Sequence, residues 1–85
     1  MDSINLSGYN FAAVTASNTA FIPQGRTTGI YIAATANLTV DDPMGNPVTF
    51  TGLAGGVVHP IRTNRVRSTG TTATGIVGLW LKDFN

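Results

Sequence analysis

The fold class is decided by residues 37–51, which read NLTVDDPMGNPVTFT. Apolar and polar residues alternate on each side of a central turn, which is the period of a β-strand with one buried face. The residues expected to point inward are Leu38, Val40, Val48 and Phe50. Those expected to point outward are Asn37, Thr39, Asp41, Thr49 and Thr51. Pro43 presets the first turn angle, and Gly45 or Asn46 can take a positive φ. The stretch predicts an antiparallel hairpin.

The rest of the chain repeats this pattern of short apolar runs between turn residues. Glu, Lys and Gln, which favour helices, are nearly absent, while β-branched residues and glycine are abundant. The sequence therefore predicts an all-β fold, a small antiparallel β-sandwich or barrel of about six to seven short strands. Besides the hairpin, the strand candidates are residues 11–15, 19–22, 29–33, 57–61, 64–69 and 76–81. Pro60 makes its strand an edge strand or a bulge.

The domain organisation follows from length and polarity. Residues 1–10 are polar and are expected to form an N-terminal arm or lead-in, and residues 11–85 a single β domain. A chain of 85 residues buries too little surface to be very stable alone, and it has no cysteine for disulfides. Oligomerisation or attachment to a larger body is the expected source of additional stability.

Charge is scarce in this chain and narrows the choice of partners. Charged residues make up 11% of the sequence, against about 25% in soluble domains. An uncharged polar surface suits a protein covered by neighbours, or else an extracellular β domain. The net charge of +1 predicts no nucleic-acid partner, and no apolar run is long enough to span a membrane. The first residues lack the features of a signal peptide, so synthesis in a cytoplasm is expected.

No residue pattern indicates an enzyme, a cofactor or a metal site. His59 is the only histidine, no nucleophile motif accompanies it, and a structural role is expected. Asp41 and Asp42 do not have the spacing of a calcium loop and are better explained as turn residues before Pro43. We therefore expect no catalytic, cofactor-binding or metal-binding residues.

Two features indicate contacts within an assembly. Arg65 and Arg67 share one face of a strand, with Arg62 just before it, and suit a subunit or intramolecular contact, a solvated face or an anionic ligand. Residues 76–81 are apolar on both faces, which is typical of a strand in a two-layer core or in an interface. The expected assembly contacts are Arg62, Arg65, Arg67, Leu79, Trp80 and Leu81.

The chain also resembles a known family through residues 48–56 (VTFTGLAGG), 60–62 (PIR) and 65–77 (RVRSTGTTATGIV). These segments resemble the small spike base proteins of tailed bacteriophages and of the gene transfer agents derived from them. The arginine segment followed by TGTTATG at 69–75 is the most specific part, and residues 11–15 and 29–32 match more loosely. Residues 81–85 depart from the family pattern, because they continue past Trp80.

The resemblance implies a virion structural protein on the capsid surface, which forms the oligomeric foot of a head spike or fibre. The implied partners are further copies of itself in a pentamer or trimer, the major capsid protein, and a spike or fibre protein. A capsid decoration protein and a small carbohydrate-binding β module are the alternatives.

Overall fold

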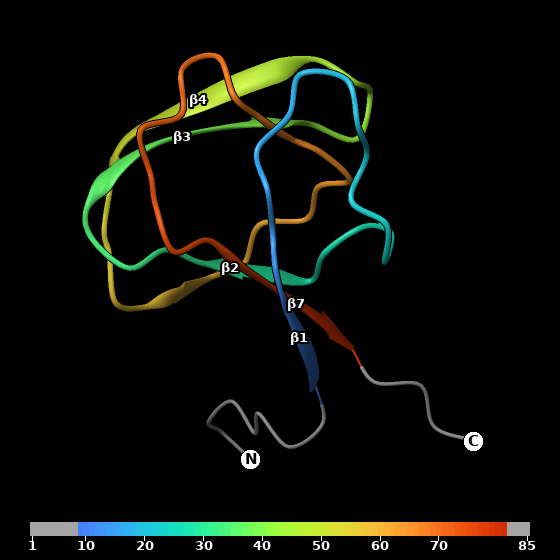
Figure 1. The fold of residues 1–85 in the computed structure, drawn as a ribbon, viewed down its shortest axis with the longest axis horizontal. Helices are drawn as coiled ribbons and strands as arrows, with labels where there is room; N and C mark the ends of the chain where they lie inside the picture. The colour runs from blue at the N-terminus through green and yellow to red at the C-terminus, as the bar shows by residue number, and fades with distance from the viewer. Residues whose placement is uncertain (1–8, 82–85) are drawn as a thin grey trace.

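The computed structural model describes residues 9–81, which form seven strands in two antiparallel sheets (Figure 1). One sheet has the strand order β1-β7-β2-β5 and the other β4-β3-β6. The strands are β1 (Tyr9–Ala13), β2 (Gly29–Tyr31), β3 (Ala36–Asp41), β4 (Pro47–Leu53), β5 (Val58–His59), β6 (Val66–Arg67) and β7 (Val77–Leu81). The predicted all-β class with about seven short strands is confirmed.

The hairpin that residues 37–51 predict is β3 and β4. Leu38 pairs with Phe50 and Val40 with Val48, so the apolar residues of both strands share one face of the sheet. In the turn, the Oδ1 atom of Asp42 accepts hydrogen bonds from two backbone amides, at 2.9 and 2.8 Å. The carboxylate thus replaces part of the backbone bonding that a tight turn cannot supply.

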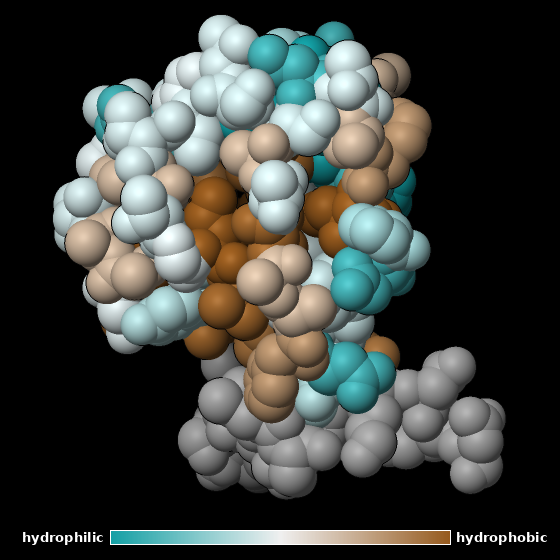
Figure 2. Space-filling view, viewed as in Figure 1, coloured by the Kyte–Doolittle hydropathy of each residue, from teal (hydrophilic) through white to brown (hydrophobic). Residues whose placement is uncertain are grey.

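The core lies between the two sheets, which form the upper and lower layers in Figure 1. In the same view, apolar atoms lie between these layers and more polar residues cover the upper one (Figure 2). Among the fully buried side chains, the largest apolar ones are Ile30, Ile32, Leu38 and Val66, which lie in or directly after strands of both sheets. Trp80 closes one end of this core, where its indole Nε1 donates to the Gly25 carbonyl at 3.0 Å.

The segment between β1 and β2 crosses from one sheet to the other. Its backbone amides at Ser17 and Ile22 donate to the carbonyls of Val66 and Asn64, at 2.8 and 2.7 Å. No strand forms at 19–22, so that expectation is wrong. The Ser17 hydroxyl accepts hydrogen bonds from the amides of Thr19 and Ala20, which bends the backbone where an extended strand was expected.

Several strand ends differ from the predicted ranges. The first strand begins at Tyr9, two residues before the expected start, and residues 1–8 of the expected arm lie outside the described part. The strand expected at 57–61 is limited to Val58–His59, since Pro60 has no amide hydrogen with which to extend the ladder. It is an edge strand, as Pro60 indicated.

Burial in the hairpin departs from simple alternation in two ways. Val48 and Phe50 face the same way as the core residues but stay 42% and 37% exposed, because β4 is the edge of its sheet. Thr39 and Asp41 lie on the outer face and yet are only 4% and 1% exposed. These two residues point outward as expected but are shielded from solvent, because the Arg65 and Arg67 side chains hold Asp41 and the loop after β6 packs against Thr39 at Gly70.

Candidate assembly surfaces

The outer face of the four-stranded sheet is apolar across its whole described width. Strand register sets three rows of outward residues, which are Ala13, Val77, Tyr31 and Val58, then Phe11, Leu79 and Gly29, then Tyr9 and Leu81. We call these nine residues the apolar face. The rows between them hold Ile30 and Trp80, which point into the core, so alternation directs the nine residues away from it.

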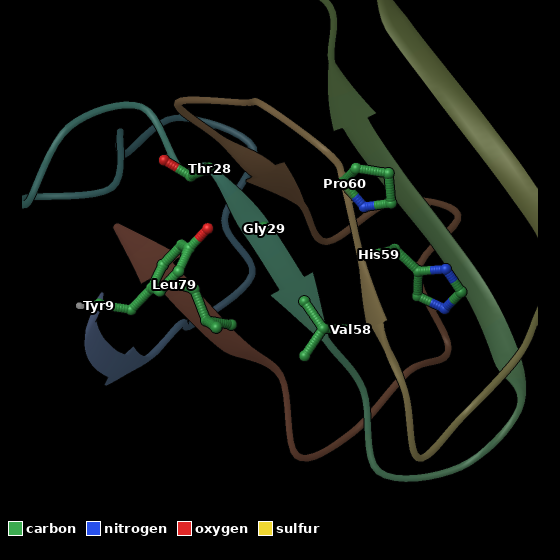
Figure 3. A pocket seen from close by; sticks show the side chains of 7 residues that line it. All are labelled: Tyr9, Thr28, Gly29, Val58, His59, Pro60 and Leu79. Atoms are coloured by element: carbon green, nitrogen blue, oxygen red, sulfur yellow. The ribbon is translucent and has the colours of Figure 1, made fainter. Parts of the chain in front are cut away.

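Exposure is uneven across the apolar face. Leu79, at its centre, is 3% exposed, whereas Phe11 and Leu81 beside it are 53% and 60% exposed. A hollow of about 260 Å³ opens next to Leu79, above Gly29, which has no side chain to fill it (Figure 3). The residues that line the hollow are Tyr9, Thr28, Gly29, Val58, His59, Pro60 and Leu79. Large apolar groups thus surround a recess that a partner's side chain could fill.

His59 borders this hollow without offering chemistry to it. Its ring nitrogen Nε2 lies 2.7 Å from the Ala54 carbonyl oxygen, and the imidazole stands on the side of β5 away from Val58 (Figure 3). Asp41 is engaged by two arginines. Within residues 9–81, no group of three or more His, Asp or Glu side chains lies close enough to hold a metal ion.

Two arginines, Arg67 in β6 and Arg65 just before it, bind a single buried carboxylate. Arg65 Nε donates to Asp41 Oδ2 at 2.7 Å, and Arg67 Nε donates to Asp41 Oδ1 at 2.6 Å. Burial alone would raise the pKa of Asp41. The hydrogen bonds from Arg67 and Arg65 and their positive charges outweigh this effect and hold the pKa of Asp41 below its ordinary value. The carboxylate is therefore ionised and neutralises one of the two arginines.

Arg65 also fixes the crossing segment between β1 and β2. Its guanidinium carbon lies 4.5 Å from the centre of the Phe21 ring, a cation–π distance. One of its terminal nitrogens donates to the Thr19 carbonyl at 3.4 Å. Of the alternatives that the sequence left open for Arg65, the structure shows an intramolecular contact.

The six residues expected at assembly contacts therefore fall in four places. Leu79 and Leu81 belong to the apolar face, Trp80 to the core, and Arg65 and Arg67 to the Asp41 cluster. Arg62 is exposed in a groove of about 230 Å³ beside the β4 edge, together with Val48, Phe50 and Ile61. Their role in an assembly stays a prediction.

Sequence reasoning missed the contribution of β1 to the apolar face. Tyr9, Phe11 and Ala13 alternate with Asn10 and Ala12, which is a strand signal, but Tyr9 was assigned to the arm. Pairing with β7 places Phe11 directly beside Leu79 and Tyr9 beside Leu81. That neighbourhood depends on which strands pair, which alternation within one strand does not determine.

Comparison with known proteins places the chain in a class. No family model and no curated protein matches the sequence. A solved structure does match, and its title is "Capsid of native GTA particle computed with C5 symmetry", where GTA denotes a gene transfer agent. The chain is 30% identical to a chain of that particle, covers 92% of both chains and superposes with a TM-score of 0.73.

This similarity extends over nearly the whole of both chains. The class that it defines is that of virion structural proteins. Within this class, the chain belongs to the capsid-associated proteins of phages and gene transfer agents. The structure also contains no helix, among the residues it describes, that is long and apolar enough to cross a membrane.

Proposed function

We propose that this chain is the oligomeric base subunit of a capsid spike or fibre, a structural protein without enzymatic activity. The apolar face is the observation that carries the proposal. In this function, the face is covered by a neighbouring subunit or by the capsid, and the spike or fibre stands on the ring of subunits.

The apolar face is unusual for a protein that acts alone. Phe11 and Leu81 are more than half exposed, and the described part of this face contains no charged residue. Soluble monomers rarely expose large contiguous apolar patches, and such patches commonly mark sites of protein association. Uncharged surface also loses little hydration free energy when it is buried, which agrees with the low charge content of the chain.

A pentamer is the proposed oligomer, and a trimer is the alternative. Closed rings match the symmetry axis on which they stand, and the related chain comes from a particle described with fivefold symmetry. The partners are further copies of this chain, the major capsid protein, and the spike or fibre. A decoration protein would share the first two partners and lack the third.

The test changes exposed residues of the apolar face to aspartate. Phe11→Asp and Leu81→Asp alter side chains that the subunit leaves more than half exposed, so both variants are expected to fold. Thr51→Asp is the matched control, because Thr51 is also an exposed strand residue but belongs to the other sheet. Leu79→Asp is unsuitable, since burying a charge at a position that is 3% exposed would unfold the subunit.

Two measurements report the outcome. Native mass spectrometry gives the oligomeric state of each purified variant, and quantitative mass spectrometry of purified particles gives the number of copies bound. We expect Phe11→Asp and Leu81→Asp to be folded monomers that are missing from particles, with Thr51→Asp like the parent. Normal oligomers and normal particle content in both variants would refute the proposed role of the apolar face. Particles that contain the chain without any spike or fibre protein would identify a decoration protein instead.

A further inference from the structure

A second surface lies on the opposite side of the subunit, on the outer face of the three-stranded sheet. Register places Arg67, Thr39 and Thr49 in one row across β6, β3 and β4. This row forms the floor of a hollow of about 500 Å³, which we call the Arg67 hollow. Its lining residues are Asn18, Thr39, Pro47, Thr49, Arg67, Thr69 and Gly70.

The Arg67 hollow carries positive charge that the described chain does not neutralise. Asp41 is one carboxylate shared by two arginines, and each of its oxygens already accepts one Nε–H. No hydrogen bond from the terminal nitrogens of Arg67 is found within residues 9–81, and the Arg67 side chain is 25% exposed. Every buried side-chain nitrogen or oxygen in that range has a partner, so these terminal nitrogens are accessible to solvent.

The rest of the lining is polar, uncharged and held in place by its own hydrogen bonds. Asn18 Nδ2 donates to Thr69 Oγ1 at 2.8 Å, and the Thr69 amide donates to Asn18 Oδ1 at 3.1 Å. The hydroxyls of Thr39 and Thr49 are 2.7 Å apart. The hollow therefore has a preformed shape, and the Arg67 guanidinium is the only charged group among its described lining residues.

An arginine whose two terminal NH2 groups are unpaired favours an oxyanion as its ligand. Its two terminal N–H groups match the spacing of the two oxygens of a carboxylate, which they bind side by side. The other described carboxylate of the chain, Asp42, is committed to its own turn. The lining contains no aromatic ring on which a sugar or a base would stack.

We propose that the Arg67 hollow receives an aspartate or glutamate side chain of a different virion protein. This inference rests on the proposed function, since it gives the subunit a second neighbour within the same particle. The apolar face holds one neighbour, and the Arg67 hollow holds the other from the opposite side. A base subunit needs two such contact surfaces, whereas a terminal decoration needs one.

Three variants separate this contact from the folding role of Asp41. Arg67→Gln removes the charge and the fork from the hollow. Thr49→Asp leaves the Asp41 cluster intact and supplies a carboxylate within the hollow, which competes with the partner's side chain. Arg65→Gln is the matched control, because it also removes one hydrogen bond to Asp41 but Arg65 does not line the hollow.

Each variant is produced in place of the parent chain, and the protein content of purified particles is quantified by mass spectrometry. Losing a charge-assisted bidentate contact is expected to weaken binding about 10- to 100-fold. Arg67→Gln and Thr49→Asp particles should therefore lose one virion protein, this chain or one attached through it, while Arg65→Gln particles keep it. Melting temperature identifies any variant that fails to fold, and Thr49→Asp is expected to melt like the parent.

The outcomes distinguish this inference from the proposed function. If the parent chain itself is absent from purified particles, the proposed function fails and this inference with it. If the parent chain is present and Thr49→Asp particles have unchanged composition, only the inference is overturned. It is also overturned if Arg65→Gln causes the same loss as Arg67→Gln, because the effect would then arise from the Asp41 cluster.

Discussion

Replacing Asp41 by asparagine tests how much the buried charge cluster stabilises the fold. The substitution keeps the shape of the side chain and removes its charge, so that Arg65 and Arg67 no longer share a carboxylate. Removing one partner of a buried ion pair, and so leaving the other charge unpaired, costs about 3–5 kcal/mol of folding free energy. The arginine side chains are 16% and 25% exposed and regain some hydration, which favours the lower end, about 3 kcal/mol.

That loss is large for this chain. Domains are stabilised by about 0.05–0.15 kcal/mol per residue, which gives about 4–13 kcal/mol for 85 residues. A domain of this size loses about 4–8 °C of melting temperature per kcal/mol, so Asp41→Asn should melt about 12–24 °C lower. The isolated chain, studied by urea denaturation and by circular dichroism melting at pH 7, provides both values.

Asp42→Asn is the control for this measurement, since asparagine also accepts the turn hydrogen bonds that Asp42 makes. It is expected to change the unfolding free energy by less than about 0.5 kcal/mol. If Asp41→Asn also costs less than about 1 kcal/mol, the pair behaves like an exposed surface ion pair. The conclusion that Asp41 organises β3, β6 and the crossing segment would then be refuted.

Three further predictions concern the stability of the subunit. Because its pKa is lowered on folding, Asp41 contributes stability that is fully present above about pH 4 and is lost as the pH falls through the folded-state pKa. Measuring the unfolding free energy as a function of acid pH checks this prediction. Gly55→Ala should cost at least about 2 kcal/mol in urea denaturation, because a Cβ there would lie 2.2 Å from the Ala34 carbonyl carbon. Trp80→Phe should cost about 1–3 kcal/mol in the same assay, since it leaves the Gly25 carbonyl without its indole donor.

The acid titration and the Gly55→Ala substitution each have an internal control. The acid-dependent part of the stability should be absent in Asp41→Asn. Gly45→Ala places a methyl group in open space at a positive φ of 89°, so it should cost only about 1–2 kcal/mol from backbone strain. A Gly55→Ala variant that loses less stability than Gly45→Ala would contradict the close approach of the two loops.

The sequence predicted the strands better than their surroundings. Alternation and turn chemistry are local properties, so the β3–β4 hairpin was predicted nearly to its ends. Burial depends on what covers each face. On the outer face of β3, the side chains of Arg65 and Arg67 lie against Asp41 and help to bury it, whereas β4 is left as an edge, which exposes Val48 and Phe50.

The same distinction holds for the candidate surfaces. The two apolar faces of β7 could be predicted, because both faces of one strand are visible in its sequence. One face of β7 packs in the core through Trp80, and the other, with Leu81, lies beside Phe11 at the surface. This arrangement depends on pairing between strands that are distant in the sequence. Because charged residues are scarce in this chain, the sequence indicates that Arg65 and Arg67 make a specific contact. It does not indicate which carboxylate they bind.

The proposed function requires the apolar face to be covered when the protein is in its particle. Because the chain has no cysteine, single cysteines can be labelled selectively with a maleimide. Leu81→Cys reports on the apolar face, and Met44→Cys, at a turn position that is 85% exposed, is the reference. We expect Leu81→Cys to react readily in the dissociated subunit and at least about tenfold more slowly in purified particles, relative to Met44→Cys, which corresponds to about 1.4 kcal/mol or more of protection. Equal relative rates in the two states would show that the apolar face stays open in the particle and would refute the proposed function.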